Sequence, residues 1–81
     1  MESTIAIIGI FVKNWESVPE LNKLLTEHGE YIIGRLGIPY HNKHINVISI
    51  VIDAPEDIVK NLCEKIGKLD GINSKLMCDS L

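Results

Sequence analysis

The sequence has few aromatic residues, two cysteines and no long apolar run. Aromatic side chains make up 5% of its 81 residues, and the longest unbroken apolar run is Ile5 to Ile8. A membrane-spanning helix needs about 20 apolar residues, so we expect a soluble protein without membrane association. The cysteines, Cys63 and Cys78, lack CxxC spacing, which predicts small buried apolar side chains and no disulfide.

Clustered positive charge is also absent. Eight basic and eleven acidic residues give a net charge of −3, and the basic residues are spread along the chain. A protein that binds the phosphate backbone of a nucleic acid gathers its lysines and arginines on one surface, so we expect no direct nucleic-acid binding. The N-terminus has neither a basic segment nor a small-residue cleavage site, which favours a cytoplasmic location.

The common catalytic motifs are missing as well. The sequence has no Gly-rich phosphate loop, no GxSxG and no HExxH, so we assign no catalytic residue, no cofactor and no metal. His41 and His44 stand three apart in a predicted hairpin loop, without a nearby residue to complete a ligand set, and are expected to be solvated. An unrecognised small enzyme remains the alternative, and it would lose turnover on changing Arg35 or His41.

Two segments have the pattern of central strands. Thr4 to Val12 and Ile45 to Ile52 are rich in β-branched residues, and each places apolar side chains on both alternating faces. Strands buried on both sides show this pattern. In the first, Ile5, Ile7 and Phe11 share one face, and the other carries Ala6, Ile8, Ile10 and Val12.

A helix start follows each of these strands. Ser17-Val18-Pro19-Glu20 and Asp53-Ala54-Pro55-Glu56 both place a capping residue, a first-turn proline and a glutamate three positions after the cap. The spacing predicts a first amphipathic helix that stops at Gly29 and a second that ends between Gly67 and Asp70.

Two further strands complete the order. Glu30 to Ile38 is expected to be an edge strand with Ile32, Leu36 and Ile38 on one face, and Asp70-Gly71 turns the chain into Ile72 to Cys78. The resulting βαββαβ order predicts an α+β, ferredoxin-like sandwich in which two helices cover one face of a four-stranded antiparallel sheet. We expect one domain over residues 1–81.

One face of that sheet has no helices to cover it. Because the central strands are apolar on both sides, this face is expected to expose a patch of roughly 300 Å², near the limit for a monomer. A domain of this size also buries only about 60% of its unfolded surface, so a partner subunit adds needed burial. We therefore expect a homo-oligomer, either a dimer or a tetramer.

Four residues are candidate ligand contacts: Asn14, Trp15, Arg35 and Gly37. Arg35, the only arginine, either pairs with a carboxylate across a subunit interface or clamps an anionic effector in a bidentate fashion. Trp15, in the loop after the first strand, either caps the core or lines a pocket at a subunit boundary. Gly37, with Gly34, permits a kinked edge strand or the close approach of a ligand or subunit.

Three segments together resemble a known family. Arg35-Leu36-Gly37-Ile38-Pro39, the aliphatic strand Val47 to Asp53, and Lys65-Ile66-Gly67-Lys68-Leu69-Asp70-Gly71-Ile72 followed by Lys75 are similar to the iron-only hydrogenase system regulators. The pattern covers most of the chain after residue 30. The resemblance implies a fold similar to ACT domains and to the C-terminal domain of the nickel-responsive repressor. Proteins of these two kinds are oligomers that bind amino acids or metal at subunit interfaces.

The resemblance has limits in this sequence. The repressor's metal site needs His-x-His on a strand, whereas this chain has His44-Ile45-Asn46-Val47, and the repressor's DNA-binding arm is missing. What the resemblance implies is a non-enzymatic, oligomeric regulatory module that binds a small effector or a protein partner. The alternative is a purely structural protein-protein interaction module.

Overall fold

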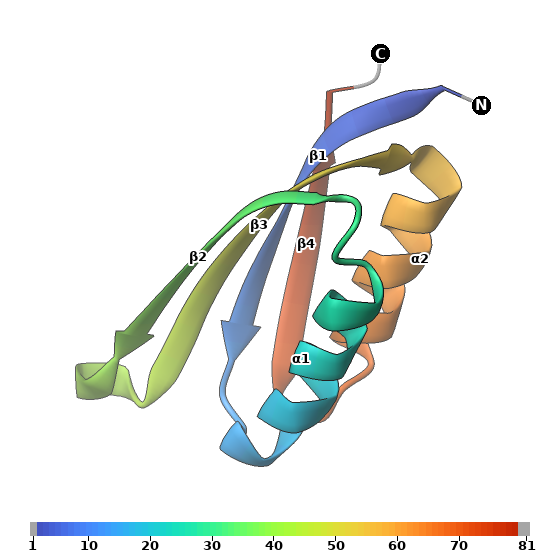
Figure 1. The fold of residues 1–81 in the computed structure, drawn as a ribbon. Helices are drawn as coiled ribbons and strands as arrows, with labels where there is room; N and C mark the ends of the chain where they lie inside the picture. The colour runs from blue at the N-terminus through green and yellow to red at the C-terminus, as the bar shows by residue number, and fades with distance from the viewer. Residues whose placement is uncertain (1, 80–81) are drawn as a thin grey trace.

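The computed structural model describes residues 2–79 and has six main elements (Figure 1). In chain order they are β1 (Ser3–Val12), α1 (Val18–Glu27), β2 (Ile32–Tyr40), β3 (Ile45–Pro55), α2 (Glu56–Gly67) and β4 (Ile72–Cys78). Short 3-10 turns at Trp15–Ser17 and His41–Lys43 precede α1 and β3. The predicted βαββαβ order is confirmed.

The four strands form one antiparallel sheet in the order β2-β3-β1-β4. Both helices lie on the same side of this sheet, as Figure 1 shows. Each crossover therefore inserts one strand between its two ends, which is the split βαβ arrangement. The predicted ferredoxin-like fold is confirmed.

The core lies between the sheet and the helices. Alternate residues of the two central strands are at most 7% exposed there, and they pack against apolar residues of both helices. On β1 and β3 these are Ala6, Ile8, Ile10, Val12, Ile48, Ile50, Ile52 and Ala54, and on the helices they are Leu21, Leu25, Val59, Leu62 and Ile66. The helices therefore cover the face of β1 that carries its buried residues, and Phe11 lies on the opposite face.

The predicted capping of α2 by Asp53 is wrong. Strand β3 continues through Asp53 to Pro55, and α2 begins at Glu56 without a side-chain cap. Asp53 instead pairs with Ile5 of β1, and its backbone N–H donates to the carbonyl of Tyr31 at 2.9 Å. The backbone of Asp53 is therefore hydrogen-bonded as part of the sheet, so this residue does not begin a helix.

Ser17 occupies the N-cap position of α1 as predicted, but its side chain makes no capping hydrogen bond. Ser17 already has helical backbone angles, because the turn Trp15–Ser17 runs directly into α1. Its hydroxyl donates to the carbonyl of Asp70 at 2.7 Å. Asn14 caps the preceding turn Trp15–Ser17, since its Oδ1 accepts from the backbone N–H of Glu16 at 3.1 Å. The helix ends at Glu27 with His28 as its C-cap, so Gly29 follows the cap directly, where the sequence predicted the helix to stop.

Strand β2 contains a bulge that changes which side chains share a face. Ile32 pairs with Ile52 and Gly34 with Val51, so Ile33 has no partner on β3. The alternation restarts after the bulge. Leu36 and Ile38 therefore lie on the face opposite Ile32, and the prediction that these three share one face is wrong.

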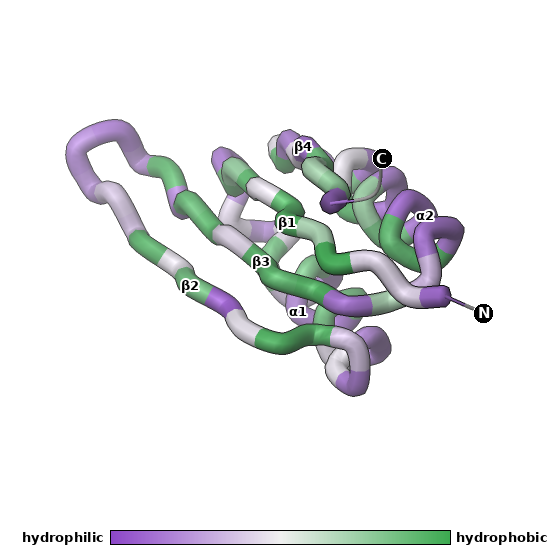
Figure 2. Tube along the Cα trace, turned by 90° about the horizontal axis from the view of Figure 1, so that it is seen from above, coloured by the Kyte–Doolittle hydropathy of each residue, from purple (hydrophilic) through white to green (hydrophobic). Residues whose placement is uncertain are grey.

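The β2–β3 hairpin extends well beyond the helices. The chain measures 41 × 19 × 18 Å, and the tip of the hairpin forms one end of the long axis in Figures 1 and 2. Figure 2 also shows that this tip is hydrophilic, whereas the strands behind it are mainly hydrophobic. Among residues 2–79, no helix is long and apolar enough to cross a membrane.

Candidate functional site

A groove of about 340 Å³ lies between α1 and the hairpin. Its walls are Trp15, Val18, Leu21 and Asn22 on one side and Arg35, Gly37, Ile38, Pro39, Asn46 and Ile48 on the other. The hairpin diverges from α1 toward its tip (Figure 1), and the groove occupies the helix-facing side of this divergence. Three of the four predicted contacts, Trp15, Arg35 and Gly37, line it.

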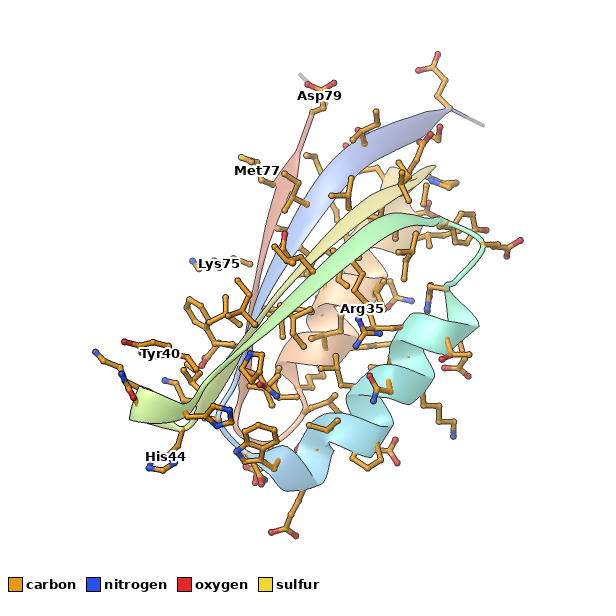
Figure 3. All side chains as sticks on the ribbon, turned by 60° about the vertical axis from the view of Figure 1, so that its left-hand side comes forward. Arg35, Tyr40, His44, Lys75, Met77 and Asp79 are labelled. Carbon is orange, nitrogen blue, oxygen red and sulfur yellow. The ribbon has the colours of Figure 1, made fainter. Side chains whose placement is uncertain are left out.

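Arg35 crosses the groove toward α1. It pairs with Ile50 on β3, whose side chain is fully buried under the helices, so both side chains project from the helix-covered face. Nη2 of Arg35 donates to Oδ1 of Asn22 at 3.1 Å, and Figure 3 shows the side chain reaching toward α1. Among residues 2–79, no carboxylate forms an ion pair with this guanidinium, since the single ion pair found there joins Lys60 and Glu56.

Gly37 and Trp15 shape the groove in opposite ways. Gly37 pairs with Ile48 on the helix-facing side of the hairpin, and a Cβ placed on it meets only Cγ1 of Ile48, at 3.9 Å. The missing side chain therefore leaves space above Ile48. Trp15 is 50% exposed and offers an accessible ring at the end of α1.

Asn14, the fourth predicted contact, does not line the groove. Its Nδ2 donates to Oδ2 of Asp70 at 2.9 Å, and the neighbouring Lys13 N–H donates to the carbonyl of Gly71 at 2.8 Å. With Ser17 on the carbonyl of Asp70, these bonds join the loop before α1 to the turn before β4. Asn14 thus holds the two loops together, at one end of the sheet.

Sequence reasoning missed the polar residues of the groove, Asn22 and Asn46. Asn22 could have been noticed as a polar residue next to Leu21, at the edge of the apolar face of α1; it is exposed, and Leu21 is buried. The pairing of Asn46 with Pro39 depends on the register of the hairpin. That register is set by the turn at His41–Lys43, which closes the hairpin.

The second candidate surface is the side of the sheet without helices, which we call the open face. Its large exposed apolar side chains come from three strands and are Ile5, Ile7, Phe11, Leu36, Ile38, Tyr40 and Met77. Figure 3 shows Tyr40, Lys75 and Met77 pointing away from the helices, opposite to Arg35. The predicted apolar patch on an uncovered face is present in the single chain.

The centre of the open face is hollow. Gly9 of β1 pairs with Ser49 of β3, and these small residues leave a hollow of about 240 Å³ between Phe11, Val47 and Lys75. A Cβ placed on Gly9 meets no atom within 4 Å. Phe11 and Val47 give the hollow apolar walls, Ser49, Asn73 and Lys75 also line it, and it has room for a large side chain from another molecule.

The histidines lie apart from both surfaces. His41 begins the turn at the tip of the hairpin and His44 ends it in a left-handed conformation with φ of 52°. His28 lies at the end of α1 and donates from Nδ1 to the carbonyl of Leu24 at 2.8 Å. Within residues 2–79 no three His, Cys, Asp or Glu side chains come together as metal ligands.

The sequence matches a family over residues 4–76. The description of this family reads "TM1266-like: Iron-only hydrogenase system regulator, putative". The resemblance found in the sequence is thereby confirmed. No curated protein is significantly similar to the chain.

Several solved structures resemble the fold, two of which are described below. The uncharacterized protein TM1266 from Thermotoga maritima is 25% identical, with a TM-score of 0.92, and the match covers 98% of this chain and 100% of that one. A formyltetrahydrofolate deformylase from Pseudomonas putida KT2440 is 14% identical, with a TM-score of 0.64 over 90% of this chain. This chain spans 28% of the deformylase, and the likeness shows the fold alone.

Proposed function

Because the chain belongs to the TM1266-like family of iron-only hydrogenase system regulators, we propose that it is a cytoplasmic, homo-oligomeric regulatory module and not an enzyme. The open face is the surface through which two copies associate. Arg35, Asn22 and Asn46, the polar side chains of the groove, are a guanidinium and two amides. Such groups neither accept nor release protons near neutral pH, which favours binding over acid–base catalysis.

The observation that carries the proposal is the apolar open face. Strands of 10, 9, 11 and 7 residues give a sheet with roughly 600 Å² of projected area, about twice the area expected from shorter strands. A stable interface buries about 800 Å² per partner, and contoured side chains add to the projected area. A second copy of the same face is large enough and apolar enough to cover it.

A two-fold arrangement also accounts for the hollow at Gly9. In a symmetric dimer each face meets its own copy, so a bulky residue of one chain is offered to the hollow of the other. Phe11 lines the hollow, Met77 lies on the same face opposite Ile7, and the two are 49% and 65% exposed. Either side chain is large enough to enter a hollow of about 240 Å³.

Sedimentation of the full chain at micromolar concentration tests this proposal. We expect a dimer or a tetramer for the natural sequence and a monomer for Phe11→Glu, because a carboxylate on the open face is costly to bury. Met77→Glu, on another strand of the same face, should act likewise. Asn61→Glu places the same charge on the exposed side of α2 and should leave the assembly unchanged.

A natural chain that sediments as a folded monomer would overturn the proposal. The open face would then serve another protein, as in the purely structural interaction module. An assembly that survives both glutamate variants would also overturn it, because the subunits would then associate through a different surface.

A further inference from the structure

The groove between α1 and the hairpin combines one unneutralised cation with apolar walls. Its lining includes a single charged residue, Arg35, among Val18, Leu21, Pro39 and Ile48. The guanidinium has five N–H donors, and one hydrogen bond, to Oδ1 of Asn22, is formed within the described chain. The remaining donors can bind an anion in the bidentate geometry that carboxylates match.

The charge of the groove selects a monoanion. No second lysine, arginine or histidine lines it, so a phosphate with nearly two negative charges would meet one positive charge. Asn22 and Asn46 add neutral amides that can donate or accept beside the anion. One guanidinium flanked by amides suits a carboxylate better than a phosphate.

The walls of the groove select an apolar body. Trp15 offers a half-exposed ring at one end, and the absent side chain of Gly37 leaves space above Ile48. A volume of about 340 Å³ is at the small end of the range for small-molecule sites, which is about 300 to 1,000 Å³. A compact molecule fits this volume and a dinucleotide does not.

We propose that the groove binds a small organic monocarboxylate with an aromatic or branched apolar body, whose carboxylate pairs with Arg35 and whose body lies against Trp15 and over Gly37. This site rests on the regulatory function proposed above, since it supplies the effector that such a function requires. Two copies joined by their open faces leave the groove accessible, because it lies on the helix-facing side of the sheet.

Fluorescence of the only tryptophan, Trp15, reports on this groove directly. The full chain is titrated with phenylacetate and, separately, with phenylacetamide, which has the same ring and no charge. We expect a saturable change in Trp15 emission with phenylacetate and at least tenfold weaker binding of the amide. Equal affinity for the two probes, or no saturable change with phenylacetate, would overturn the proposal.

Three variants locate the binding. Arg35→Gln should weaken phenylacetate binding at least tenfold and leave the weak amide binding unchanged. Gly37→Val should abolish the response to both probes at an unchanged melting temperature, since the added Cβ has an ordinary contact with Ile48 and valine suits a strand. Lys65→Gln removes a cation from the exposed side of α2, away from both surfaces, and should change neither affinity. Unchanged binding by Arg35→Gln or by Gly37→Val contradicts the site.

The outcome for the groove is independent of the outcome for assembly. Saturable binding of phenylacetate to a chain that sediments as a monomer would overturn the association through the open face and leave the carboxylate site in place. An assembled chain that binds neither probe would overturn the carboxylate site alone.

Discussion

Gly71 is the residue whose conformation most constrains its replacement. Its φ is +70°, and a Cβ placed on it would overlap Cβ of Asn14 and lie 3.0 Å from the Asn14 backbone nitrogen. Alanine is disfavoured at this position for two reasons: this φ is unfavourable for L-residues, and the loop that contains Asn14 leaves no room for a Cβ. We expect Gly71→Ala to lower the free energy of unfolding by about 2 kcal/mol, or the melting temperature by roughly 10 °C.

Gly34→Ala is the matched control for this change. Gly34 has no positive φ, and a Cβ placed on it meets no atom within 4 Å, so its melting temperature should stay within about 3 °C of the natural value. Thermal unfolding followed by circular dichroism, at one protein concentration, measures both. Equal melting temperatures for the two alanine variants would show that Asn14 and Gly71 do not approach so closely.

At the same scale, the sequence located some residues and misjudged the role of others. Asp70-Gly71 was predicted as a turn, because glycine after aspartate is a local signal. Asn14 was predicted as a ligand contact, yet its side chain bonds to Asp70, 56 positions away. A contact between loops so distant in sequence has no local signature. Trp15, Arg35 and Gly37 do share a groove, and their role in binding remains a prediction.

Among the elements, β2 is the one whose register depends on a single residue. Ile33 lies in the bulge, is 63% exposed and has no partner on β3, while Ile32 and Gly34 pair with adjacent residues of that strand. Removing Ile33 therefore leaves every other pairing of β2 possible. We expect deletion of Ile33 to lower the free energy of unfolding by no more than about 1 kcal/mol.

Deletion of Leu36 is the contrasting change in the same strand. Leu36 pairs with Ser49, so its loss moves the rest of β2 by one position and turns each following side chain to the other face. We expect a loss of at least about 2 kcal/mol. Urea unfolding measures both deletions, and nuclear Overhauser contacts between Gly37 and Ile48 report the register. A larger loss from deleting Ile33 than from deleting Leu36 would contradict the assigned bulge.

The elements also show why local patterns predict some boundaries and not others. β4 lies at Ile72–Cys78 as predicted, because a glycine turn precedes it and its apolar residues alternate. The start of α1 after Ser17 lies as predicted, whereas the start of α2 was misplaced. The proline and glutamate signals at Asp53 were real in the sequence, but pairing of β3 with β1 through Pro55 displaced the helix start to Glu56. Long-range pairing overrides capping wherever a strand continues into the capping residues.

For the whole molecule, the sequence predicted the fold class and the uncovered apolar face, because both follow from hydrophobic periodicity. The shape of the groove could not be predicted from the sequence. That shape depends on how far the hairpin extends past α1, and therefore on strand lengths and sheet twist. The predicted edge strand ended at Ile38, whereas β2 continues to Tyr40; the start of β3 at Ile45 is as predicted.

The proposed association through the open face would make the stability of the fold depend on protein concentration. A dimer that unfolds to two separate chains is favoured by mass action, so its melting temperature rises as the protein is concentrated. With an unfolding enthalpy of about 0.7 kcal/mol per residue, each tenfold increase should raise the melting temperature by about 4 to 5 °C. Differential scanning calorimetry over a hundredfold range of protein concentration measures this slope.

Phe11→Glu, which should be monomeric, is expected to melt at one temperature throughout that range, while Asn61→Glu should keep the natural slope. A natural chain whose melting temperature is independent of concentration would show that burial of the open face does not contribute to the stability of the fold.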